Sequence, residues 1–277
     1  MGNLSKRLQT VAGLVTSAGV IADIGTDHAY IPIYLLEEKR AVRAIAMDVN
    51  RGPLERAKEH VREAKLEELV DLRLSDGLER LNPGEADSVI IAGMGGGLVI
   101  RILEAGDKRA GAAHLAREYI LQPQSELEKV REYLLGAGYR FVQEEMVLDE
   151  GKYYPMMRVL PPKSASARQD GESGGESCGE SCGESCRHNR DEESCWNRTS
   201  LRYGKLLLEQ RHPVLRQYLE REQRIKREIF RDLRRRLDGG DEEKAHILRR
   251  LEELEEELDV IGKGLDYYEL RRDYEAD

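Results

Sequence analysis

The chain has 277 residues, 35% of them charged, and a formal net charge of −9 at pH 7. This length allows one large domain or two smaller ones, and the acidic balance argues against indiscriminate nucleic-acid binding but permits a local basic surface. No apolar run approaches the roughly 20 residues needed to span a bilayer. Thr16 and Ser17 interrupt the mildly apolar stretch after Lys6 and Arg7, so we expect no signal peptide and a cytoplasmic protein.

Residues 1–162 alternate short apolar runs with amphipathic stretches. Four apolar runs each precede a stretch with helical periodicity: residues 20–25, 44–50, 87–93 and 118–124. This alternation is typical of buried parallel strands covered by helices on both faces, and it predicts a doubly wound, mostly parallel α/β sheet. Residues 139–160 have the pattern of two strands around a turn, which predicts an antiparallel edge strand. Ser125 is placed to cap the helix that follows Gln124.

Residues 163–198 form a break in composition, rich in Ser, Gly and Glu, with little apolar surface. This segment contains every cysteine of the chain: Cys178, Cys182, Cys186 and Cys195. The spacing C-x3-C-x3-C-x8-C with His188 nearby invites a metal or iron–sulfur interpretation, but the glycine in each Gly-Glu-Ser-Cys repeat opposes the stable helix that would align the thiols. We therefore predict a disordered linker and no metal.

Residues 199–277 have the pattern of two long helices joined at Gly239-Gly240. The second carries a heptad seam: Ile247, Leu251, Leu254, Leu258, Ile261, Leu265 and Tyr268. Residues 201–236 contain 12 Lys and Arg against 5 Asp and Glu, whereas residues 237–277 contain 6 against 15. The short glycine connection and the opposite charges predict an antiparallel helical hairpin, or coiled coil.

Glycines and acidic residues stand at the ends of four predicted strands: Asp23 to Asp27, Asp48 to Asn50, Ser75 to Gly77 and Ala92 to Gly97. In open α/β sheets, ligands bind at the carboxyl ends of the strands. Gly25 would let the backbone approach a ligand closely. Asp48 can accept both hydroxyls of a ribose, while Asp76 can accept from an adenine amino group and Val49 can cover the ring. Together these residues predict a nucleoside-cofactor site.

The first strand ends in G-T-D-H-A-Y, where a dinucleotide fingerprint would have G-x-G-x-x-G. A pyrophosphate prefers bare N–H groups, and Asp23 and Asp27 would repel it. The sulfonium and α-ammonium groups of S-adenosylmethionine reverse this preference, because carboxylates attract both cations. The loop therefore favours S-adenosylmethionine over NAD.

Several segments closely resemble the bacterial tRNA (adenine-22-N1)-methyltransferase family: ADIGTDHAYIPIYL, AMDVNRGPLERA, LSDGL, IAGMGGGL, LQPQSE and DEGKYYPMM. The resemblance implies a Rossmann-like S-adenosylmethionine-binding domain over residues 1–162, a C-terminal coiled-coil domain and a tRNA substrate. It also implies a cofactor pocket lined by Asp23, Gly25, Asp27, His28, Asp48, Val49, Asp76, Gly77, Ala92, Gly93 and Met94. The sequence departs from the family in LQPQ, where L-Q-P-N is expected, and in the cysteine-rich insert.

The residue types restrict the methyl acceptor. Methylation of pyrimidine carbon 5 commonly uses a cysteine nucleophile, and the predicted α/β domain has none. The segment A-G-M-G-G stands where enzymes acting on an exocyclic adenine amine have (D/N)-P-P-(Y/F). Adenine N1 already has a lone pair, so its methylation requires positioning and desolvation rather than a strong base. Asp27 would favour the cationic product, and Tyr30 or His28 would hold the base, which makes these three the candidate catalytic residues.

An acidic protein needs a basic surface to hold RNA, and residues 201–236 supply the candidate. The predicted RNA-binding residues are Lys6, Arg7, Arg224, Lys226, Arg227, Arg231, Arg234 and Arg235. The alternative interpretation is that these charges solvate the coiled coil and pair with the acidic helix.

Two other classes of function remain open. One is methylation of a small molecule or a protein, with the coiled coil as a dimerisation device. The other is a non-catalytic RNA- or partner-binding protein, which the intact acidic strand ends argue against. The sequence leaves the oligomeric state open, and we take a monomer as the simpler expectation.

Overall fold

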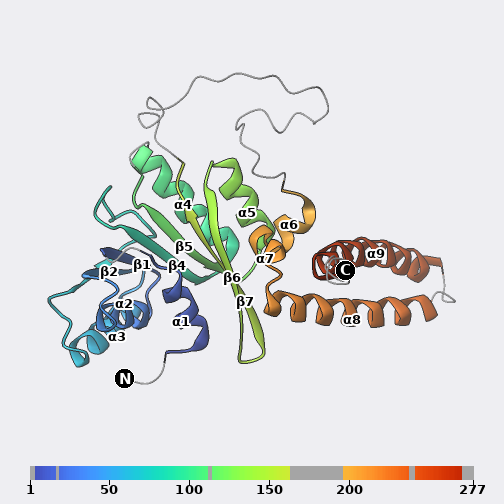
Figure 1. The fold of residues 1–277 in the computed structure, drawn as a ribbon, viewed down its shortest axis with the longest axis horizontal. Helices are drawn as coiled ribbons and strands as arrows, with labels where there is room; N and C mark the ends of the chain where they lie inside the picture. The colour runs from blue at the N-terminus through green and yellow to red at the C-terminus, as the bar shows by residue number, and fades with distance from the viewer. Residues whose placement is uncertain (1–3, 17–18, 112–113, 163–195, 237–240, 270–277) are drawn as a thin grey trace, which may run out of the picture.

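The computed structural model describes residues 4–16, 19–111, 114–162, 196–236 and 241–269. An α/β body forms one part of the molecule, and the last two helices extend from it side by side (Figure 1). Most of the predicted linker, with all four cysteines, lies outside the described residues, so its disorder and lack of metal stay predictions.

Within the described ranges, a sheet of seven strands forms the centre of the body, in the order β3-β2-β1-β4-β5-β7-β6. The strands are β1 Val20–Ile24, β2 Arg43–Asp48, β3 Val70–Leu74, β4 Ser88–Met94, β5 Glu118–Pro123, β6 Arg140–Asp149 and β7 Lys152–Leu160. β1 to β5 pair in parallel, and β7 is antiparallel to both of its neighbours. The doubly wound, mostly parallel sheet is thus confirmed.

The predicted antiparallel edge strand was placed wrongly. The chain turns back after β6 so that β7 pairs with β5, which leaves β6 at the edge and β7 inside the sheet. The carboxyl end of β6 therefore lies at the same edge as those of β4 and β5, and the turn between β6 and β7 projects there (Figure 1).

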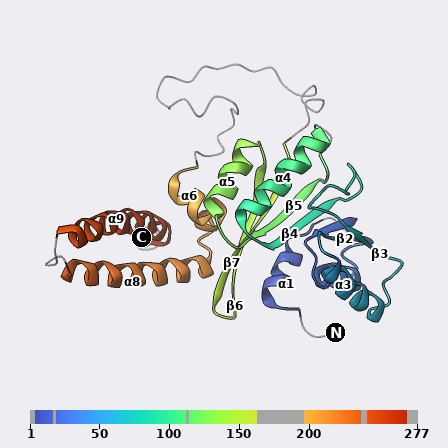
Figure 2. The ribbon, with the colours of Figure 1, turned by 180° about the vertical axis from the view of Figure 1, so that it is seen from behind.

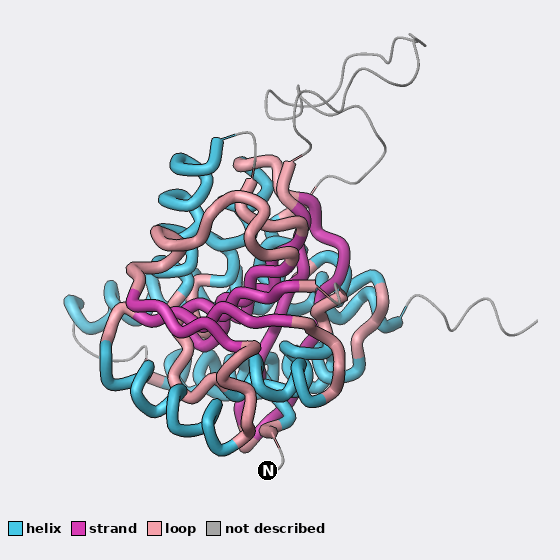
Figure 3. Tube along the Cα trace, turned by 90° about the vertical axis from the view of Figure 1, so that its left-hand side faces the viewer, coloured by secondary structure: helices cyan, strands magenta, loops and turns pink. Residues whose placement is uncertain are grey.

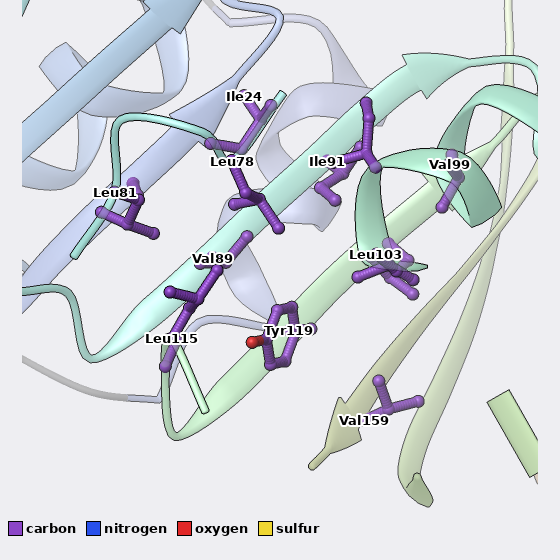
Figure 4. Close-up of a cluster of buried hydrophobic side chains, with 14 of the residues drawn as sticks. Ile24, Leu78, Leu81, Val89, Ile91, Val99, Leu103, Leu115, Tyr119 and Val159 are labelled. Carbon is purple, nitrogen blue, oxygen red and sulfur yellow. The ribbon is translucent and has the colours of Figure 1, made fainter. Parts of the chain in front are cut away.

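Helices cover both faces of the sheet (Figure 3). On one face, α1 (Lys6–Gly13), α2 (Tyr30–Glu37) and α3 (Arg51–Glu63) contribute to one apolar core. On the other, α4 (Gly96–Ala110) and α5 (Leu127–Gly136) lie side by side (Figure 2). Their core includes Val99 and Leu103 of α4 over Ile91 and Tyr119 of the sheet (Figure 4). Burial of these apolar side chains is the main driving force for this part of the fold.

The described residues of the C-terminal part form four helices: α6 (Arg198–Tyr203), α7 (Lys205–Glu209), α8 (Pro213–Arg235) and α9 (Asp241–Glu269). The first long helix that we predicted is therefore interrupted twice. Gly204 has a φ of 96°, and Pro213 cannot donate the backbone hydrogen bond that a continuing helix requires. α8 and α9 pack antiparallel, since Lys226 pairs with Glu257 at 2.6 Å and the Tyr268 hydroxyl donates to the His212 carbonyl.

A buried ion pair fastens the short helices to the body. The Arg131 side chain of α5 and the Glu144 side chain of β6 are 1% and 0% exposed, with 2.9 Å between Arg131 Nε and Glu144 Oε1. Arg131 Nη1 donates to the carbonyls of Leu201 and Arg202, and the Leu206 N–H donates to Glu144. Each charge is thus hydrogen-bonded to the α6–α7 segment, which joins that segment to the sheet.

Candidate active site

The end of β1 forms the floor of the candidate site. Asp23 is 7% exposed, and burial raises its pKa to about 6, with Thr26 opposing this shift and Asp48 adding to it. Gly25 has a φ of 75°, and its N–H donates to the Met47 carbonyl of β2. A Cβ at this position would collide with Met94 Cε. Met94 therefore occupies the space that a side chain at this position would need, which requires a glycine.

The ends of β2 and β3 lie beside this floor, joined by a hydrogen bond from the Ser75 N–H to the Asp48 carbonyl. Asp48 is half-buried and accepts the Asn50 N–H, while Val49 is 57% exposed and Asp76 is exposed. Gly77 follows Asp76 with a φ of 52°. The predicted ribose and adenine contacts thus come together at one edge of the sheet.

β4 ends in a bulge. Gly93 has a φ of 82°, and the pairing with β5 skips from Ala92 to Met94. The Gly96 N–H, in the first turn of α4, donates to Ser125 Oγ at 3.3 Å, and the Gly97 N–H donates to the Glu126 carboxylate. Ser125 therefore caps α4, and our prediction that it caps α5 was wrong.

The Asp27 carboxylate is paired with a cation that we did not predict. Arg56 Nε of α3 donates to Asp27 Oδ1 at 2.9 Å, and His28 Nε2 lies 3.5 Å from Asp27 Oδ2. Sequence reasoning missed Arg56 because a charged residue on an amphipathic helix looks like a solvated one. The local charge of the loop is thus smaller than its acidic residues indicated.

Three aromatic rings stack beside this pair. The centroids of His28, Tyr30 and His60 lie 4.9 to 5.2 Å apart with interplanar angles of 9 to 24°. His60 Nδ1 lies 3.2 Å from the His28 carbonyl. His28 Nδ1 is buried and has no hydrogen-bond partner among the described residues, while Tyr30 is 45% exposed. The stack joins the first turn of α2 to α3 and leaves one ring open to solvent.

Arg7 was predicted to lie on an RNA-binding surface, but it is half-buried at the ends of β4 and β5. Its Nη1 donates to the Oε1 of buried Gln122 at 2.8 Å, and its guanidinium lies 5.4 Å from the ring centroid of Tyr154. A Cβ at Gly93 would be 3.7 Å from Arg7 Nη1. Arg7 is therefore a fixed cation beside the β4 bulge, whereas Lys6 is exposed.

The predicted basic residues of α8 divide into two groups. Lys226 lies within 2.6 Å of Glu257 and 3.4 Å of Glu222, so it pairs with the acidic helix as the alternative interpretation expected. Arg235 lies 3.3 Å from Asp232. The exposed members are Arg224, Arg227, Arg231, Arg234 and Arg235.

Among the described residues, no cluster of three or more His, Cys, Asp or Glu could hold a metal ion. None of the described helices is both long and apolar enough to cross a membrane.

Residues 4–157 match the profile of a family described as a methyltransferase domain. The chain belongs to this family, whose match covers the whole of the sheet that carries the site except the end of β7. Over 155 residues the chain is 43% identical to the tRNA (adenine(22)-N(1))-methyltransferase of Bacillus subtilis, an alignment covering 56% of this chain and 63% of that protein. The aligned stretch thus spans less than two thirds of this curated relative.

Two solved structures share the fold over nearly the full chain. The B. subtilis M1A22 tRNA methyltransferase TrmK has a TM-score of 0.71 and 28% identity, covering 95% of this chain and 99% of that one. Streptococcus pneumoniae Sp1610, a putative tRNA (m1A22) methyltransferase solved with S-adenosyl-L-methionine, has a TM-score of 0.68 and 26% identity, covering 92% and 100%.

Proposed function

We propose that the protein transfers a methyl group from S-adenosylmethionine to N1 of adenine 22 in tRNA. The observation that carries the proposal is the floor of the candidate site at the end of β1. There a buried carboxylate, Asp23, stands beside Gly25 in a chain that belongs to the methyltransferase family. The names of the B. subtilis relative and of the two solved neighbours support the same substrate.

The residues present suit this cofactor. Bound S-adenosylmethionine supplies a methyl carbon made electrophilic by its sulfonium. Ionised Asp23 is suited to receive the α-ammonium group, and Asp48 to receive the ribose hydroxyls. Val49 offers an exposed apolar face to the adenine, and Asp76 an acceptor for its amino group. The remaining predicted contacts are the backbone and side chains of Gly25, Asp27, His28, Gly77, Ala92, Gly93 and Met94.

Adenine N1 needs no proton removed, so the work of the protein is to hold the base in line with the methyl group and to exclude water. Arg7 beside Gly93, and the exposed Tyr30 ring on the His28 stack, are the groups we assign to holding the target nucleotide. Asp27 would stabilise the positive charge of the product, with Arg56 moderating that effect.

The proposal is tested by incubating the protein with labelled S-adenosylmethionine and total bacterial tRNA, then separating the nucleosides. We expect label in 1-methyladenosine, mapped to position 22 by primer extension. Label in a small molecule or a protein instead would favour the alternative methyltransferase, with the coiled coil as a dimerisation device. Absence of transfer to any acceptor, with cofactor binding lost as well, would favour a non-catalytic protein.

The catalytic role of Asp27 is tested by Asp27→Asn, with Arg56→Gln as the matched control. We expect Asp27→Asn to lower the single-turnover rate more than it weakens cofactor binding. Arg56→Gln frees the carboxylate and keeps its charge, so it should retain the rate. Normal single-turnover rates in Asp27→Asn would refute the catalytic role.

The exposed basic residues of α8 are proposed to bind tRNA together with Lys6 and Arg7. Deleting residues 199–277 should abolish tRNA methylation and leave cofactor binding, but it would also uncover the Arg131–Glu144 pair. Charge reversal in the full chain is the sharper test, and Arg224→Glu with Arg231→Glu should raise the Kd for tRNA without changing that for the cofactor. Unchanged tRNA affinity would remove this pair of α8 residues from recognition.

A further inference from the structure

A cavity lies between the α/β body and the C-terminal helices. Its volume is about 900 Å³. The loop after β5, the first turns of α5, the start of β7, α6 and α8 contribute its walls. Figure 1 shows the turn between β6 and β7 reaching down beside the first turns of α8. The sequence resemblance assigned none of these walls to a ligand.

The cavity lies next to the candidate active site. Gln124 and Tyr154 line it, and both also border the β4 bulge. A Cβ at Gly93 would be 3.8 Å from Gln124 Nε2, and the Tyr154 ring lies under the Arg7 guanidinium. A polymer whose target base enters beside Gly93 would therefore pass directly into this cavity.

One wall is aromatic and basic. Tyr153 and Tyr218 pack edge to face, with ring centroids 5.2 Å apart, and the guanidinium of Arg221, a neighbour outside the lining residues, lies 5.9 Å from the Tyr153 ring centroid. Arg202 and Lys152 complete this wall. Within the described part of the chain, no carboxylate lies in salt-bridge range of the Arg202 or Arg221 guanidinium. Aromatic rings with unpaired cations are the combination that binds single-stranded nucleic acid.

The part of the lining at the start of α5 carries three carboxylates, together with Lys129 and Arg131. The Glu126 carboxylate already accepts from Lys129 and from the Gly97 N–H. The other two carboxylates of this part of the lining, those of Glu128 and Glu132, are available to a ligand. These carboxylates would repel a small anion such as free phosphate. A nucleotide can bind, because its phosphate can lie on the basic side of the cavity while the amino groups of its base donate hydrogen bonds to the carboxylates.

We infer that this cavity holds the nucleotides adjoining the target adenine of the substrate RNA, with phosphates on Arg202 and Arg221 and a base against Tyr153. This inference rests on the proposed function and adds to it a specific binding site for the strand. It adds an RNA contact at the domain junction, next to the site of transfer, to the contacts proposed along α8.

The test compares two double variants of the full chain. The cavity pair combines Arg202→Ala and Arg221→Ala in one protein, and the control pair combines Arg43→Ala and Arg117→Ala in another. The second pair removes the same charge from exposed positions at the opposite, amino-terminal edge of the sheet. Affinity for a fluorescein-labelled, unmodified tRNA transcript is measured by anisotropy at several salt concentrations, and cofactor affinity by calorimetry. Tyr153→Ala is compared with Tyr153→Phe, which retains the ring.

We expect the cavity pair to raise the Kd for tRNA about tenfold or more and to lower the slope of log K against log salt by about one to two. Tyr153→Ala should raise the Kd roughly tenfold, and Tyr153→Phe should leave it unchanged. The cofactor Kd should stay within about twofold throughout. The inference would be overturned if the wild type methylates tRNA and the cavity pair has the same Kd for tRNA and the same salt dependence as the control pair. Failure of the wild type to methylate tRNA would overturn the proposed function itself.

Discussion

Replacing Arg131 with methionine tests whether the buried ion pair holds the C-terminal helices on the α/β body. The substitution leaves Glu144 fully buried with the Leu206 N–H as its remaining donor, and it removes the donor from the Leu201 and Arg202 carbonyls. Removing one partner of a buried pair costs about 3–5 kcal/mol, because the other charge is left without compensation. We expect a loss of this size in the free energy of unfolding.

Two further variants separate this effect from general damage. Arg198 pairs with Glu256 at 3.2 Å with both side chains more than half exposed, so Arg198→Met should cost less than about 1 kcal/mol. The double variant Arg131→Met with Glu144→Met removes the uncompensated charge and should cost less than Arg131→Met alone.

The assay uses the single tryptophan of the chain. Trp196 precedes α6 and packs on Phe141 of β6 with ring centroids 4.7 Å apart, so its fluorescence is a probe of this junction. Urea unfolding is followed by this fluorescence and by circular dichroism. In Arg131→Met the fluorescence transition should move to lower urea than the dichroism transition. A free-energy change no larger than that of Arg198→Met would refute the reasoning.

Three further predictions concern the floor of the candidate site at the end of β1 and the junction between the sheet and the α6–α7 segment. The pKa of Asp23 is about 6 in the folded protein against an ordinary 3.8, so ionising this group costs stability as the pH rises from about 4 to 6. Asp23→Asn should therefore stabilise the ligand-free protein at pH 7.5 by as much as about 3 kcal/mol, and a destabilised variant would contradict this. In the wild type, calorimetry should detect cofactor binding that tightens between pH 5 and 7, and Asp23→Asn should abolish this pH dependence. Gly25→Ala places an alanine at a positive φ, where it is strained, and its Cβ displaces Met94. The cofactor Kd should therefore rise about tenfold, and an unchanged Kd in calorimetry would contradict this prediction. Gly204→Ala would bring a Cβ to 2.7 Å from a Glu144 oxygen at a φ of 96°, and the Trp196 transition should show a loss of more than about 2 kcal/mol; an unshifted transition would show that the junction tolerates a side chain.

The parallel part of the sheet could be predicted because each buried strand is a short apolar run followed by an amphipathic helix. The position of β7 could not. A hairpin pattern shows that β6 and β7 pair, but which of them adds to β5 depends on contacts between distant segments. The same limit explains Ser125, whose hydroxyl accepts from α4 although α5 is nearer along the chain.

The strand-end residues of the site could be predicted because parallel strands bring their carboxyl ends to one edge, whatever the rest of the fold. Asp48 and Asp76 are there as expected. The cations were missed or misplaced. Arg56 and Arg7 lie on helices whose charges look solvated in sequence, and only the packing of α3 and α1 brings them to Asp27 and Gln122.

This packing changes the electrostatic explanation of cofactor choice. A loop with several acidic residues appears uniformly anionic in sequence, yet Arg56 balances Asp27 and burial holds Asp23 near its protonation midpoint close to pH 6. Selectivity for a cation must then come mainly from Asp23, because burial makes its ionisation unfavourable. An arriving ammonium group supplies the missing counter-charge and lowers that cost, whereas a phosphate adds to it. The buried acid thus distinguishes the two ligands more strongly than an exposed one would, because the penalty for the wrong charge is not screened by solvent.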